Sequence, residues 1–109
     1  MAYNFLTHTN GDTFDGVKIT LTVNGSPLDL TDASVTMNMY LFDGAQPIVF
    51  STENGKLSIP DPATDGIVEF NKQIVAVPTI GTYFYQMIYT LADGTVKTFV
   101  EGDWTIKKA

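Results

Sequence analysis

The sequence predicts an all-β fold, an antiparallel β-sandwich of about seven to nine short strands. In its longest apolar segments, apolar and polar residues alternate with a period of two, as they do in strands buried on one face. Asp-Gly, Asn-Gly and proline-containing turns separate these segments at regular spacing. Apolar residues rarely recur at the spacing of a helix. The three observations together favour packed sheets over packed helices.

The 109 residues suit one domain, which would bury about two thirds of the surface that its unfolded chain exposes. We expect residues 1–10 to form an N-terminal arm or a short strand, and residues 11–109 to form the sandwich domain. Cysteine is absent, so no disulfide, thiolate nucleophile or sulfur-ligated zinc site contributes. Packing therefore has to supply the stability.

Charge and terminal sequence narrow the classes of partner. The formal net charge is −6, and all 6 basic residues are lysine. Arginine supplies the planar fork used on phosphates and base edges, so its absence argues against nucleic-acid binding. The first residues lack the pattern of a signal peptide, and no apolar segment approaches the ~20 residues that cross a bilayer. We expect a soluble, intracellularly made protein without a nucleic-acid or membrane partner.

The first ten residues carry three large apolar side chains, Tyr3, Phe5 and Leu6, ahead of a glycine turn. Two interpretations stay open. The segment is a short first strand or a loosely ordered terminus, as chain ends often are. Alternatively, it is an arm that docks on a neighbouring subunit, because three such side chains are unfavourable in water.

Two alternating segments, residues 17–23 and 33–42, predict the first long strands. The polar face of the second segment also carries Tyr40 and Phe42. Shorter strands are expected at residues 48–50, 56–59 and 67–70, and residues 74–77 are expected to form either a strand or one turn of helix. The predicted core residues of the two long segments are Val17, Ile19, Leu21, Val35, Met37 and Met39.

Residues 81–106 predict a hairpin and an exit strand. Asp93-Gly94 lies between β-branched and aromatic residues, which favours a two-residue type I′ turn with φ above zero at both positions. That turn pairs Leu91 with Val96 and fixes the register of both strands. On this register, the core face carries Tyr85, Met87, Val100 and Trp104.

The opposite face of the hairpin is expected to carry a contiguous apolar patch of Phe84, Ile88 and Phe99. Burying such a patch in a partner is worth about 3–6 kcal/mol before association costs. Either a protein partner covers the patch, or a loop or the N-terminal segment of the same chain does.

Catalytic and metal-binding patterns are missing from the sequence. His8 is the only histidine and has no serine, cysteine or acidic partner at a recognisable spacing. Asp61 and Asp65 lie in a loop that invites comparison with a calcium site, but aspartate is also a favoured turn residue and the full ligand ladder is absent. We expect no enzyme activity, no catalytic residue, no metal and no cofactor.

Tyr83 follows Gly-Thr at the start of a late strand, the position of the tyrosine corner in immunoglobulin-like sandwiches. Several motifs occur in a fixed order: G-D-T-F, P-L-D-L-T, G-T-Y-x-Y, D-G-x-V-K-T and G-x-W-x-I. Over about residues 11–106, this order resembles the immunoglobulin-like domains of tailed-phage virion structural proteins, such as the N-terminal domain of the baseplate upper protein. The resemblance implies an immunoglobulin-like sandwich in a virion.

The resemblance implies a non-enzymatic virion part that binds neighbouring virion proteins or itself in a symmetric assembly. Domains of this family usually continue into further modules, whereas this sequence ends at Ala109, which favours a capsid auxiliary or decoration role, or a head-fibre, tail or baseplate accessory. The candidate interface residues are Tyr3, Phe5, Leu6, Phe84, Ile88 and Phe99. The alternative is a host-surface or glycan-binding adhesion module that uses the loops at residues 43–47 and 61–66.

Overall fold

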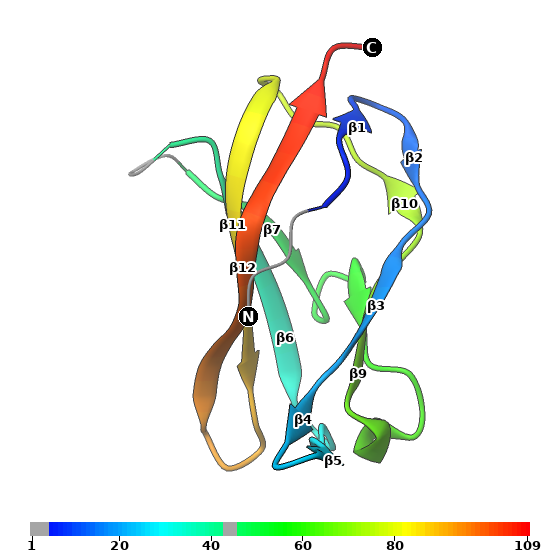
Figure 1. Cartoon of the computed structure of the whole chain (residues 1–109), viewed down its shortest axis with the longest axis vertical. Helices are drawn as coiled ribbons and strands as arrows, with labels where there is room; N and C mark the ends of the chain where they lie inside the picture. The colour runs from blue at the N-terminus through cyan, green and yellow to red at the C-terminus, as the bar shows by residue number, and fades with distance from the viewer. Residues whose placement is uncertain (1–4, 43–45) are drawn as a thin grey trace.

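A computed structural model describes residues 5–42 and 46–109 of the chain. Its described residues form an all-β globule of β-strands and one short 3₁₀ helix, without an α-helix (Figure 1). Several of the strands are only two residues long. The elements are β1 (His8–Thr9), β2 (Thr13–Phe14), β3 (Val17–Thr20), β4 (Thr22–Val23), β5 (Ser26–Pro27), β6 (Ser34–Tyr40), β7 (Ile48–Ser51), β8 (Leu57–Ser58), η1 (Ala63–Asp65), β9 (Ile67–Phe70), β10 (Gln73–Ile74), β11 (Gly81–Thr90) and β12 (Val96–Lys107).

The largest layer is a five-stranded sheet with the order β1-β12-β11-β6-β7. β11 pairs antiparallel with β12 on one side and with β6 on the other, and β1 joins β12 in parallel. The other ladders are a three-stranded sheet, β3-β9-β8, and the pairs β4-β5 and β10-β2. Figure 1 shows β6, β11 and β12 on one side of the molecule and β3 and β9 on the other. The large sheet is therefore covered on one face by the smaller ladders.

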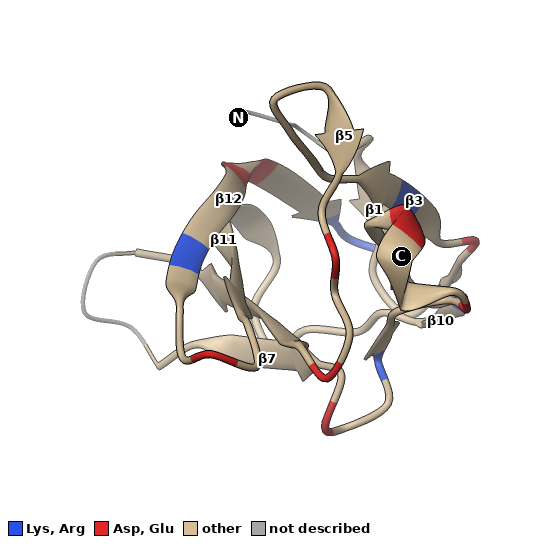
Figure 2. Ribbon diagram, turned by 90° about the horizontal axis from the view of Figure 1, so that it is seen from below, with Lys and Arg blue, Asp and Glu red and all other residues tan. Residues whose placement is uncertain are grey.

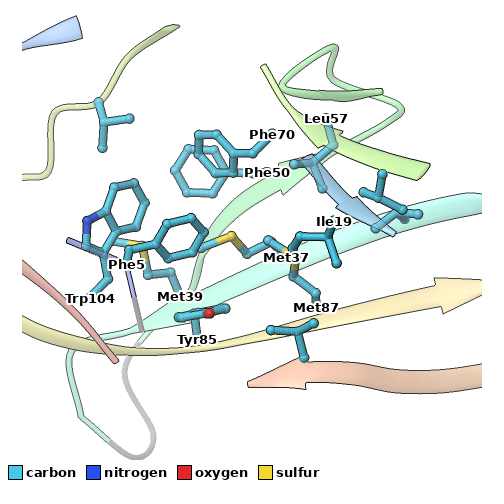
Figure 3. Close-up of a cluster of buried hydrophobic side chains, with 14 of the residues drawn as sticks. Phe5, Ile19, Met37, Met39, Phe50, Leu57, Phe70, Tyr85, Met87 and Trp104 are labelled. Atoms are coloured by element: carbon cyan, nitrogen blue, oxygen red, sulfur yellow. The ribbon is translucent and has the colours of Figure 1, made fainter. Parts of the chain in front are cut away.

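The core lies between these layers and is rich in aromatic and methionine side chains (Figure 3). Trp104 is fully buried and packs with Phe70, which comes from the facing three-stranded sheet. Val17 is only partly buried, although it packs against the same cluster. The other predicted core residues are buried, as expected: Ile19, Leu21, Val35, Met37, Met39, Tyr85, Met87, Val100 and Trp104.

The N-terminal segment is built into this core, contrary to the expectation that Phe5 meets another protein. Phe5 is only 6% exposed, and its ring centroid lies 4.6 Å from that of Trp104 and 5.0 Å from that of Tyr85. The Asn10 N–H donates to the carbonyl of Lys107, beside the parallel pairing of β1 with β12. The sequence is compatible with two interpretations of this segment, a short strand and a docking arm. The described part of the segment contains a short strand, whose neighbour Phe5 is a core residue.

The hairpin tip differs from the predicted type I′ turn. The Leu91 N–H donates to the Thr95 carbonyl, and the Gly94 N–H donates to the Leu91 carbonyl, so three residues rather than two form the loop. Of the three loop residues only Gly94 has positive φ, at 92°, which is the pattern of a type I turn followed by a left-handed glycine. Hydrogen bonds from Thr95 close the loop and hold the pKa of Asp93 below its ordinary value.

A β-bulge at Phe99 offsets the one-residue shift in strand register that begins at the hairpin tip. Thr90 pairs with Val96 and Ile88 with Thr98, one residue away from the prediction, whereas Met87 pairs with Val100 as predicted. Phe99 is the extra residue between these two registers, and an extra residue lets two consecutive side chains lie on the same face. The Phe99 ring lies 5.6 Å from that of Tyr89 and packs against the core. Phe99 therefore leaves the predicted outer patch and faces the interior.

Candidate interaction surface

The face of the five-stranded sheet that points away from the core is the candidate functional surface. Its side chains alternate with the buried ones along β6 and β11, which alternate buried with less buried positions almost throughout. Two rows of directly opposed residues cross the strands. One row runs from Tyr40 through Phe84 to Asp103, and the other runs from Val49 through Asn38 and Gln86 to Glu101.

The apolar end of this face carries three aromatic rings, which we call the aromatic patch: Tyr40, Phe42 and Phe84. Phe84 is 43% exposed and Phe42 is 66% exposed. With Gln86, the three rings line an open hollow of about 530 Å³. Single exposed apolar side chains are normal on proteins, but adjacent exposed rings around a hollow are the usual mark of a binding surface.

The opposite end of the face is acidic. Glu101 and Asp103 are exposed on β12, directly opposite Gln86 and Phe84 (Figure 2, red). Neighbouring strands lie about 4.8 Å apart, so each carboxylate is one strand away from the aromatic patch or its amide neighbour. β6, β7 and β11 contribute no lysine, since none occurs within their bounds. From β6 across β11 to β12, one row therefore changes from aromatic to acidic, and the neighbouring row changes from amide to acidic.

The predicted interface residues do not form one surface. Tyr3 lies outside the described residues, Phe5 is in the core, and Phe99 faces the interior. Leu6 is exposed, but it belongs to the N-terminal segment and not to the outer face of β11. Phe84 is exposed, and Ile88 is half-buried on the same face. Only Phe84 and Ile88 therefore lie where the sequence placed the patch.

Tyr40 and Phe42 are the members of the aromatic patch that sequence reasoning did not include. The alternation placed both rings on the polar face of their strand, and two rings on such a face were an available signal. The sequence does not show which residues lie beside these two rings, because β6 and β11 are far apart in the chain and no turn fixes their register. The structure pairs Phe84 with Tyr40 and so brings the rings of β6 and β11 together.

One edge of the sheet is closed by a side chain. The Asn54 carboxamide accepts a 2.9 Å hydrogen bond from the Ser51 N–H and donates a 3.1 Å bond to the Val49 carbonyl, both on the outer edge strand β7. This is the pair of bonds that a residue of an added parallel strand would make. Asn54 therefore occupies the bonding positions at which another chain would extend the sheet.

Tyr83 makes the local contact that the sequence predicted. Its hydroxyl donates a 2.5 Å hydrogen bond to the carbonyl of Thr79, four residues upstream, and its ring is buried. Burial raises the pKa of the Tyr83 hydroxyl, because a phenolate is poorly solvated there. Tyr83 thus fixes the turn that leads into β11.

The acidic loop and the histidine have structural roles. The loop containing Asp61 and Asp65 folds into η1, and the Ala63 carbonyl accepts a hydrogen bond from the Leu30 N–H. His8 is buried, and its Nε2 lies 3.1 Å from the carbonyl oxygen of Val75. Within residues 5–42 and 46–109, no group of three or more acidic, histidine or cysteine side chains is arranged to hold a metal ion.

Comparison with known proteins does not assign the chain to a family. No protein-family model matches the chain, and no curated protein matches it. Among the described residues there is no helix with the length and apolar character needed to span a membrane. The case for function therefore rests on the resemblance in sequence and on the surface described above.

Proposed function

We propose that the chain is an immunoglobulin-like module of a phage virion. Immunoglobulin-type sandwiches place one sheet with a central C, F and G arrangement against a second sheet that contains B, E and D. The order β1-β12-β11-β6-β7 facing β3-β9-β8 supports this assignment, with β11 in the place of strand F. The hydrogen bond from Tyr83 to Thr79 at the start of β11 supports it as well, because the tyrosine corner lies there.

The proposed activity is attachment to a neighbouring virion protein through the outer face of the five-stranded sheet. The observation that carries this proposal is the aromatic patch around a hollow, in which Phe42 and Phe84 are exposed and Tyr40 is half-buried. Aromatic residues dominate the energetics of protein interfaces because they bury a large area with few rotatable bonds. A capsid, tail, head-fibre or baseplate position would all use such a surface.

Incorporation into particles tests this proposal. We expect Phe84→Asp to abolish incorporation, because it places a charge at the centre of the contact, while the fold remains intact. Ile74→Asp is the matched control, since Ile74 is also an exposed apolar residue but lies on β10, away from this face. The copy number of each variant in purified virions, relative to the major capsid protein, is the measurement. Normal incorporation of Phe84→Asp would refute this interface.

Glycan binding on the same face is the second candidate function. Aromatic rings pack against the C–H faces of sugars, and the Gln86 amide beside them can both donate to and accept from hydroxyl groups. In this proposal the glycan site is on the sheet rather than in the predicted loops, of which residues 43–45 lie outside the described part of the chain. A glycan array probed with the wild type and Phe84→Asp decides between the candidates: patch-dependent glycan binding favours the second.

A further inference from the structure

The chain contains three Asn-Gly pairs, and the structure restrains them to different degrees. They are Asn10-Gly11, Asn24-Gly25 and Asn54-Gly55. In such a pair the glycine nitrogen can attack the asparagine Cγ, because glycine has no Cβ in the way and adopts many backbone conformations. The reaction needs a carboxamide that can turn and a backbone nitrogen that can reach it. The hydrogen bonds of each pair therefore decide which pair reacts.

Asn10-Gly11 is held at both of its reacting groups. The Asn10 Nδ2 donates a 3.1 Å hydrogen bond to the Val77 carbonyl, and the Oδ1 accepts a 2.7 Å bond from the Val77 N–H. The Gly11 N–H donates a 2.9 Å bond to the Val75 carbonyl. Three hydrogen bonds must therefore break before the Gly11 nitrogen can attack the Asn10 Cγ.

The Asn54 carboxamide is held at both of its ends. Its Oδ1 accepts hydrogen bonds from the Ser51 N–H at 2.9 Å and from the Lys56 N–H at 3.1 Å. Its Nδ2 donates a 3.1 Å bond to the Val49 carbonyl. The carboxamide therefore cannot turn toward the Gly55 nitrogen without losing three hydrogen bonds.

The Asn24-Gly25 pair lacks these restraints. It forms the two-residue turn that joins β4 to β5, where Val23 pairs with Ser26. Asn24 and Gly25 are exposed and have positive φ, 53° and 80°. In the part of the chain that the structure describes, no group bonds to the Asn24 carboxamide, and nothing lies within 4 Å of a Cβ built on Gly25. β4 and β5 are exposed throughout, so this turn can open at low cost.

We propose that Asn24 is a site of spontaneous covalent modification. The Gly25 nitrogen forms a bond to the Asn24 Cγ, and the side-chain NH₂ takes up the proton of the Gly25 N–H and leaves as ammonia. The product is a succinimide ring, which water opens to aspartate or isoaspartate. Water is the only co-reactant. The inference goes beyond the proposed function, because the reacting turn lies outside the five-stranded sheet.

The products change the β4–β5 turn in two ways. Each modified chain gains one negative charge in addition to its formal net charge of −6. In isoaspartate the main chain also runs through the Cβ, so the turn becomes one atom longer. Two-residue turns join paired strands only when the turn geometry matches the strand twist. We therefore expect isoaspartate at position 24 to disrupt the pairing of Val23 with Ser26.

Peptide mapping by mass spectrometry tests the inference on the whole chain. The protein is incubated in warm, mildly alkaline buffer, and a sample taken at time zero corrects for conversion during digestion. Replacement of NH₂ by OH raises the mass of a peptide by about 1 Da. We expect Asn24 to convert about tenfold faster than Asn10 or Asn54, because each of those pairs must first break three hydrogen bonds that each slow the reaction a few-fold.

The same incubation in urea is the matched control, because unfolding removes the hydrogen bonds and leaves the sequence unchanged. The three pairs should then convert at rates within about threefold of one another. Equal conversion of the three pairs in the folded protein, or faster conversion of Asn10 or Asn54, would overturn the inference. A preference for Asn24 that persists in urea would overturn it too, because the folded structure would not be its cause.

A second measurement follows the effect of the product on the turn. The amide signals of Val23 and Ser26 in ¹⁵N-labelled protein should shift as isoaspartate accumulates. Asn24→Gln is the control variant, because its longer side chain forms the corresponding ring much more slowly, and its signals should stay constant over the same time. Shifts that develop equally in this variant would show that the turn changes for another reason, against the inference.

Discussion

The Trp104 indole Nε1–H donates a 3.0 Å hydrogen bond to the carbonyl oxygen of Leu6, 98 positions earlier in the chain. A buried indole N–H needs a partner, because an unsatisfied donor in the interior is costly. The N-terminal segment supplies that partner through its backbone. The hydrogen-bond partner of the only tryptophan therefore comes from the segment for which the sequence predicts an arm or a short strand.

Phe5 and Leu6 should differ sharply in their effect on stability. Phe5→Ala should lower the free energy of unfolding by about 3 kcal/mol, because it removes a buried ring from the aromatic core. Leu6→Ala should change it by less than about 0.5 kcal/mol, because the Leu6 side chain is exposed and its carbonyl bond to Trp104 is retained. Urea unfolding followed by tryptophan fluorescence measures both. Equal effects would mean that Phe5 does not occupy the core in solution.

The β-bulge puts two phenylalanines of the hairpin in different environments, so replacing them should also have different effects on stability. Phe99→Ala should destabilise the protein by about 1–2 kcal/mol, since the ring is partly buried against Tyr89. Phe84→Ala should be within about 0.5 kcal/mol of the wild type, because its ring is exposed. Thermal and urea denaturation of both variants test this. Were Phe84→Ala the more damaging change, the assignment of inner and outer faces would be wrong.

Gly66 should be far less tolerant of alanine than Gly94, although both have positive φ. A Cβ at Gly66 would lie 2.6 Å from the Leu21 carbonyl oxygen and 2.9 Å from the Leu28 nitrogen, whereas at Gly94 nothing lies within 4 Å. Gly94→Ala should cost about 1 kcal/mol from backbone strain alone. Gly66→Ala should cost more, because backbone atoms must also move. Similar unfolding midpoints for the two variants would contradict the close approach at Gly66.

Tyr83 should make stability depend on pH only in alkaline solution. Because its folded pKa is raised above the ordinary value of 10.0, its contribution is complete below pH 10 and is lost as the pH rises through the folded pKa. An ionised hydroxyl also cannot donate to the Thr79 carbonyl. Tyr83→Phe should cost about 1 kcal/mol at pH 7 and show a smaller loss above pH 10. The measurement is the urea midpoint of the wild type and of Tyr83→Phe from pH 7 to 11.5. If the midpoints of the two proteins fall equally steeply above pH 10, Tyr83 is not the source of the alkaline dependence.

Asn54 should keep the β7 edge closed. Asn54→Ala removes the bonds to Ser51 and Val49 and leaves those backbone groups open to another strand. We expect about 1 kcal/mol of destabilisation and concentration-dependent association, measured by sedimentation velocity. Asn38→Ala is the control, because it removes an asparagine from the face of β6 rather than from an edge. If the Asn54 variant stays monomeric at high concentration, the edge is protected by something else.

Period-two alternation predicted the core because it is a local property. It placed Met37 and Met39 on β6, and Tyr85 and Met87 on β11, on one face without knowledge of how the strands pair. Local pattern could not place Phe5, whose contacts with Tyr85 and Trp104 join distant parts of the chain. The all-β class was therefore accessible from the sequence, whereas docking of the N-terminal segment was not.

The candidate site was harder to predict, because it depends on register. Asp93-Gly94 is compatible with a two-residue or a three-residue loop, and only the hydrogen bonds of Leu91 distinguish them. Nothing in the residue types marks Phe99 as the bulged position. The outer face also combines Tyr40 with Phe84 across a strand pair that no short turn connects.

The bulge at Phe99 divides the hairpin into two regions that can vary independently. On the side of the bulge away from the tip, Met87 pairs with Val100 in the register that positions Trp104. On the tip side, the strands pair in a register shifted by one residue, which the loop around Gly94 sets. A length change at the tip can be absorbed before it reaches the tryptophan, provided that Phe99 keeps its place. A change confined to the tip would therefore leave the core and the outer face of the sheet in place.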